Sequence, residues 1–97
     1  MRNDPPILNA FRSDLGQRKH TYATRACYVT AARAFLRQHG DRDLDELTPR
    51  EVRRYLEALK ARGVSLSSRE GARAGLVQFL GFLVRRRVQE PRLARAA

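Results

Sequence analysis

The sequence predicts an all-α protein, a compact bundle of four helices. Apolar residues recur at three- and four-residue spacing in four separate segments, as they do on the buried face of an amphipathic helix. Prolines, hydroxyl residues and glycines stand where these segments begin and end. No segment alternates as a strand does, and no internal repeat is evident. The 97 residues are enough for one modest core and too few for a second.

The first two helices are expected near residues 5–15 and 22–39. The first follows Asp4, a predicted N-cap, and has prolines in its first turn, where a missing N–H costs nothing. Its apolar pattern ends at Gly16, and the second helix begins after Thr21 as its cap. The residues predicted to face the core are Ile7, Leu8, Phe11, Leu15, Tyr28, Ala31, Ala32, Phe35 and Leu36.

The third helix, expected near residues 49–62, has the clearest start signal in the chain. Thr48 is the predicted N-cap, Pro49 takes the first helical position, and Glu51 is placed to bond back to the cap. Gly63 then ends the helix. Its buried stripe is predicted to consist of Val52, Tyr55, Leu56 and Leu59.

The fourth helix is expected near residues 68–87, with Ser67 as its N-cap and Glu70 completing a capping box. Three glycines lie in its interior, each costing about 1 kcal/mol relative to alanine, so tertiary packing must hold this helix. Its predicted apolar stripe consists of Ala72, Leu76, Phe79, Leu80 and Leu83. The domain is expected to cover residues 1–90, and residues 91–97 to begin a linker.

Positive charge is concentrated in two parts of the chain. Residues 1–40 contain seven Lys or Arg against two Asp or Glu, and residues 64–97 contain the same numbers. Residues 41–63 balance at six against six, so the two basic segments hold the whole net charge of +10. Such segments attract a polyanion, which makes nucleic acid the first partner to consider. A competing explanation is genomic base composition, because eighteen of the twenty cations are arginine.

Several classes of protein are excluded by the composition. No apolar run approaches the ~20 residues of a membrane span, and the N-terminus lacks the layout of a signal peptide, so a cytoplasmic protein is expected. The single cysteine, Cys27, cannot form an internal disulfide and is expected to fill the core. There is no metal-ligand spacing, paired-carboxylate pocket or glycine-rich phosphate loop. We therefore expect no metal, cofactor, small-molecule substrate or catalysis in this chain.

Several motifs follow one another in a distinctive order: Thr21-x-x-Thr24-x-x-x-Tyr28, the run Leu44 to Leu56, Leu66-Ser67-Ser68, and Leu76-x-x-Phe79-x-x-Phe82-Leu83. Together they resemble the N-terminal core-binding, SAM-like domain of tyrosine recombinases, the phage integrase and Xer-like family, over about residues 5–91. The resemblance implies a SAM-like four-helix domain that grips one side of duplex DNA with its second and fourth helices. It also implies that DNA integration or recombination is catalysed by a separate domain, absent from this chain.

The predicted DNA contacts gather at the starts of the second and fourth helices, where free N–H groups and the helix dipole favour phosphate. They are Arg18, Lys19, His20, Thr21, Thr24, Arg25, Ser67, Ser68, Arg69 and Arg73. Two alternatives stay open: Thr21 and Ser67 could serve only as caps, and the cations could simply be solvated. Gln78 is the candidate for reading a base edge, because its neighbours on the outer face are mostly small.

A helical protein-interaction module with a basic docking surface is the second hypothesis. Exposed apolar residues such as Leu8, Val64 or Leu66 would then matter more than the cations. The DNA hypothesis requires the Lys19/Arg25 pair and the Arg69/Arg73 pair to face one duplex, and it is lost if they lie at opposite poles. Self-association on DNA, the target sequence and the type of mobile element are left open.

Overall fold

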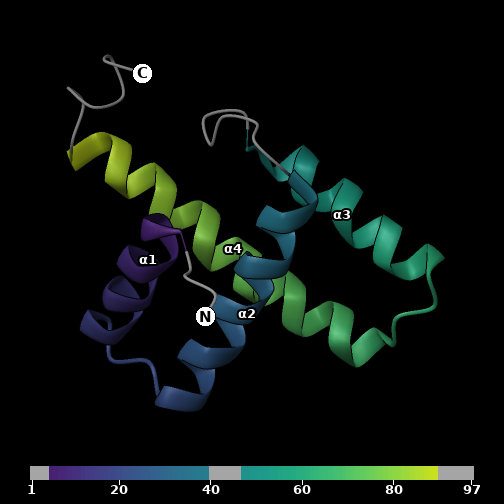
Figure 1. Ribbon diagram of the computed structural model, residues 1–97, viewed down its shortest axis with the longest axis horizontal. Helices are drawn as coiled ribbons and strands as arrows, with labels where there is room; N and C mark the ends of the chain where they lie inside the picture. Colours follow the sequence, from purple (N-terminus) through teal and green to yellow (C-terminus); the bar gives the residue numbers. More distant parts are fainter. Residues whose placement is uncertain (1–4, 40–46, 90–97) are drawn as a thin grey trace.

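The computed structural model describes residues 5–39 and 47–89, and they form four helices (Figure 1). These are α1 (Pro6–Gln17), α2 (Tyr22–His39), α3 (Pro49–Ala61) and α4 (Leu66–Gln89). The described residues contain no strand, so the predicted all-α class is confirmed. The radius of gyration is 13.6 Å, close to the value of about 13 Å expected for a compact domain of this length.

Helices α2 and α4 cross at the centre of the bundle, with α1 on one side and α3 on the other (Figure 1). At the crossing, a β-carbon added to Gly75 would lie 2.9 Å from the β-carbon of Ala31 and 3.1 Å from the α-carbon of Tyr28. No side chain fits there unless α2 moves. The close approach of α2 and α4 therefore explains why position 75 is glycine, whereas Gly71, also inside α4, faces open space.

Aromatic contacts in the core join α1 to α4 and α2 to α3. The ring of Phe11 on α1 packs against Phe79 and Phe82 on α4, at centroid distances of 5.1 and 5.4 Å. Phe35 on α2 meets Tyr55 on α3 edge to face at 5.2 Å. The buried core consists of Leu8, Phe11, Leu15, Val29, Ala32, Phe35, Leu47, Val52, Leu76, Phe79, Phe82 and Leu83.

Most predicted core positions are buried or half-buried, and four residues differ from expectation. Val29 and Phe82 are buried although the sequence stripes omit them. Helix α2 packs against α1 and α4, and α4 packs against α1, α2 and α3, so both helices bury a wider face. Cys27, expected in the core, is exposed on α2 and is not a core residue. Leu8, offered as a surface residue for protein binding, is completely buried.

Two helix starts differ from those predicted. The N-cap of α1 is Pro5, which makes no side-chain capping bond, and Asp4 lies outside the described residues. The N-cap of α4 is Ser65 and not Ser67, because the Ser65 hydroxyl accepts a hydrogen bond from the backbone N–H of Ser68 at 3.2 Å. Ser67 lies within the first turn.

Other boundaries agree more closely. Helix α3 begins after Thr48 as predicted, although the Thr48 side chain makes no capping hydrogen bond. Helix α1 continues past Gly16 to Gln17. In the described ranges, no helix has the length and apolarity that crossing a bilayer demands. Residues 91–97, the predicted linker, lie outside the described residues.

Candidate nucleic-acid interface

The turn between α1 and α2 has the same backbone structure as the turn between α3 and α4. Each preceding helix ends in a Schellman motif. The N–H of His20 donates to the carbonyl of Leu15 at 3.2 Å, and the N–H of Val64 donates to the carbonyl of Leu59 at 3.0 Å. Residues 18–25 thus correspond to residues 62–69, an internal repeat that the sequence did not reveal because the two segments share only their first and last arginine.

Lys19 and Gly63 occupy the same left-handed position in these two turns, with φ of 64° and 83°. Glycine adopts this conformation without penalty, whereas an L-residue with a β-carbon loses about 1 kcal/mol there. Lys19 is the one non-glycine residue with positive φ in the described part of the chain. A strained, exposed cation at a turn is the kind of outlier from which a functional hypothesis is justified.

The helix that follows each turn is capped by a hydroxyl residue that is hydrogen-bonded to a second hydroxyl residue three positions later. The Thr21 hydroxyl accepts a hydrogen bond from the N–H of Thr24 at 3.2 Å, and the Ser65 hydroxyl does the same for Ser68. Each capping hydroxyl also donates to the hydroxyl three residues later, at 2.9 and 3.1 Å. The predicted capping role of Thr21 is confirmed, and a contact between Thr21 and DNA stays a prediction.

Beyond the caps, the repeat continues with a large exposed side chain and an arginine. Tyr22 and Leu66, the first residues of α2 and α4, are 80% and 60% exposed. Arg25 lies against Gly16, with its guanidinium 6.0 Å from the Tyr22 ring centre, and its buried Nε has no hydrogen-bond partner. Arg69 instead donates from its Nε to the carbonyl of Val64 at 3.1 Å.

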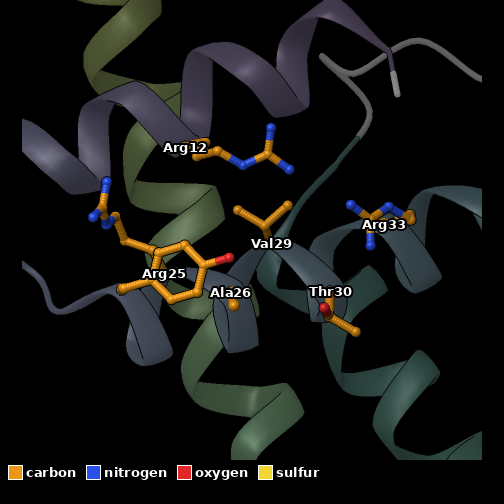
Figure 2. A pocket seen from close by; sticks show the side chains of 7 residues that line it. Arg12, Arg25, Ala26, Val29, Thr30 and Arg33 are labelled. Carbon is orange, nitrogen blue, oxygen red and sulfur yellow. The ribbon is translucent and has the colours of Figure 1, made fainter. Parts of the chain in front are cut away.

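A cavity of about 160 Å³ between α1 and α2 is surrounded by three arginines. Figure 2 shows Arg12 reaching it from α1, and Arg25 and Arg33 from α2, around Val29. Its lining contains no acidic residue: Arg12, Tyr22, Arg25, Ala26, Val29, Thr30 and Arg33. At about 30 Å³ per water, the cavity has room for a phosphate-sized anion.

Arg12 and Arg33 of this cavity were missed by reasoning from sequence. Neither is among the predicted contacts, and nothing in the sequence brings Arg33 near Arg12. Arg12 also donates to the Asn9 side chain at 3.0 Å. The packing of α1 on α2 is what places the guanidinium groups together.

The other predicted contacts are more scattered. Arg69 and Arg73 line cavities between α3 and α4, and Arg25 lines the cavity between α1 and α2, so Arg25 does not share a groove with the Arg69/Arg73 pair. In Figure 1 the start of α2 lies at the lower left and the start of α4 at the lower right, so the two starts are separated along the longest axis of the molecule. Gln78 is half-buried and lies twelve residues after Leu66, about 18 Å along α4.

The remaining predicted residues are placed as follows. Arg18, the C-cap of α1, and Lys19 are exposed, as are Ser67 and Ser68 in the first turn of α4. His20 is half-buried, and its ring packs edge to face on Tyr28 at 5.8 Å. Among residues 5–39 and 47–89, no three His, Cys, Asp or Glu side chains gather as metal ligands would. The described site therefore consists of cations, hydroxyl groups and helix starts.

Comparison with known proteins identifies a family. The family model described as phage integrase, N-terminal SAM-like domain matches residues 7–90, which include all of α2, α3 and α4 and nearly all of α1. No curated protein and no solved structure matches the chain significantly.

Proposed function

The chain belongs to the family of phage integrase N-terminal SAM-like domains, and from that premise we propose that it binds duplex DNA through the starts of α2 and α4. In this proposal it holds one side of the duplex during integration or recombination. The bond-breaking chemistry belongs to a separate tyrosine recombinase domain. The observation that carries the proposal is the repeated turn, 18–25 and 62–69.

Each turn offers the same set of groups to a phosphate. A helix start has N–H groups without partners inside the helix and the positive end of the helix dipole. The hydroxyl cap fixes the first turn, and an arginine follows at the fourth helical position, Arg25 or Arg69. Two such sets, separated along the longest axis of the molecule, suit a ligand with two phosphate strands (Figure 1).

The arginine cavity between α1 and α2 extends this surface. Its three guanidinium groups are on one side of α2, and from Arg25 to Arg33 the helix rises about 12 Å. Phosphates on one DNA strand follow each other every 3.4 Å of duplex axis, so this length corresponds to more than one phosphate. One guanidinium group can donate two parallel hydrogen bonds to two oxygens of a phosphate, so arginine is well suited to bind the DNA backbone.

Binding to a 24-base-pair duplex, measured by fluorescence anisotropy between 50 and 300 mM salt, tests the proposal. Four or five phosphate contacts would give a slope of log affinity against log salt of roughly −4, at about −0.9 for each phosphate. The double change Arg25→Gln and Arg69→Gln should weaken binding about tenfold or more and reduce the slope by about 2.

The matched control is the double change Arg37→Gln and Arg54→Gln, which removes the same charge from exposed positions outside both turns. It should weaken binding much less. Equal losses in the two double variants would mean that DNA responds only to net charge, and the proposed surface would be wrong. Circular dichroism of each variant separates unfolding from lost binding.

We also propose that this chain contributes binding and not chemistry. Attack on phosphate by a tyrosine needs an activated phenol, and burial raises the pKa of Tyr55 while Arg62 only partly opposes this. Tyr22 lies among the arginines of the cavity but is largely exposed. A nicked duplex that traps phosphotyrosine should give no covalent adduct with this chain. An adduct that disappears in Tyr22→Phe would overturn this part of the proposal.

A further inference from the structure

Two adjoining cavities form a groove between α3 and α4. Figure 1 shows these two helices as neighbours, joined by the turn that precedes α4. The two cavities, of about 380 and 180 Å³, share Leu56 and Arg73. The lining of the groove extends from Pro49 in the first turn of α3 to Lys60 in the last. The 13 residues of α3 make it about 20 Å long, which is the length of a partner helix of three to four turns.

The larger cavity is mostly apolar. Five of its seven lining residues are apolar: Pro49, Val52, Leu56, Val77 and Leu80. Val77 is 52% exposed at its edge, although a branched apolar side chain favours burial. DNA backbone contacts need hydrogen-bond donors, and these five side chains have none. The groove therefore suits apolar side chains of a protein better than phosphates.

The charged residues that line the groove are mainly positive. Arg53 and Arg73 are the only charged residues lining the larger cavity, and the smaller one adds Lys60, Arg69, Glu57 and Glu70. Four cations thus stand against two carboxylates. A second copy of this chain, with its net charge of +10, would be repelled. A partner with acidic residues beside an apolar stripe would be attracted.

We propose that the groove between α3 and α4 binds an amphipathic helix of another protein, whose apolar stripe is flanked by Asp and Glu. Its apolar side chains, three and four residues apart, would cover Val77 and Leu56, and its carboxylates would face Arg53 and Arg73. The larger cavity lies outside both repeated turns, whereas the smaller one shares Leu66 and Arg69 with the second turn. The groove gives the domain a protein partner while the helix starts hold DNA.

Three designed peptides of 16 residues test the proposal. They share one leucine stripe and carry Glu, Gln or Lys on both flanks, and their binding to the chain is measured by fluorescence anisotropy. The Glu peptide should bind about tenfold more tightly than the Gln peptide, and the Lys peptide should not bind. Failure of all three to bind, or equal binding of all three, would overturn the proposal.

Two matched pairs of variants locate the binding. Val77→Gln should weaken the Glu peptide about tenfold, whereas Val84→Gln should not, since Val84 is equally exposed on α4 but lies outside the groove. Arg53→Gln should likewise weaken it and Arg54→Gln should not. Equal effects within either pair would contradict the placement. If Val77→Gln weakens duplex DNA binding as strongly as peptide binding, the groove belongs to the DNA surface and the proposal is wrong.

Discussion

Replacing Gly75 with alanine should destabilise the domain, although alanine is the better helix former. Alanine gains about 1 kcal/mol over glycine inside a helix. Here the new methyl group would stand 2.9 Å from the β-carbon of Ala31 and 3.1 Å from the α-carbon of Tyr28. The second contact is with backbone, so α2 itself must shift, and such overpacking costs about 1–3 kcal/mol. The difference between these two terms is a net loss of up to about 2 kcal/mol in the free energy of unfolding.

Gly71→Ala is the matched control, because it lies one turn earlier on α4 with nothing within 4 Å of its added methyl group. It should stabilise the domain by about 0.5–1 kcal/mol. Urea and thermal unfolding, followed by circular dichroism, measure both variants. About 2 kcal/mol between them corresponds to a difference of roughly 8–16 °C in Tm. If Gly75→Ala is as stable as Gly71→Ala, then α2 and α4 do not approach as closely as described.

Three further predictions concern the turns and the core. Lys19→Gly should leave stability unchanged or raise it by up to about 1 kcal/mol, because glycine adopts the left-handed conformation without penalty. The same change should weaken DNA binding, because it removes a cation. Chemical denaturation measures the stability and fluorescence anisotropy the DNA binding, and a loss of both would contradict the strain argument. Ser65→Ala should lower stability by about 1 kcal/mol and Ser67→Ala by much less, as measured by urea unfolding; the reverse order would restore Ser67 as the cap. Burial raises the pKa of Tyr55 above the unfolded value of 10.0, so the unfolded state loses its proton first and stability should fall as pH rises above 10. Tyr55→Phe should reduce the slope of stability against pH in alkaline denaturation. An unchanged slope would exclude this residue as its source.

The number of helices and their approximate bounds follow from periodicity alone, but the start of α4 does not. Ser65, Ser67 and Ser68 offer competing capping frames, and local spacing favoured Ser67 with Glu70. The frame that forms lets Gly63 close α3 first and leaves room for Arg69 to bond the Val64 carbonyl. The choice of Ser65 as the N-cap depends on where α3 ends, and the spacing of residues within α4 carries no information about that.

The candidate site was predictable only where its residues are neighbours in the chain. The group from Arg18 to Arg25 forms one turn, as its order along the sequence implies. Arg12 and Arg33 are 21 positions apart and approach each other only because α1 packs on α2. The correspondence between the two turns depends on backbone conformation, with lysine in one and glycine in the other, so comparing residue types could not reveal it.

The contacts of Phe11 and Gly75 have a consequence for how the chain folds. Phe11 completes its packing only on rings about seventy residues later, and at Gly75 the backbone of α4 lies against the backbone of Tyr28 and the β-carbon of Ala31 on α2. Each helical hairpin alone would leave half of its apolar face in water, and isolated helices of this length are marginal. The rate-limiting step should therefore be the docking of one hairpin onto the other, and separately expressed halves should remain largely unstructured until mixed.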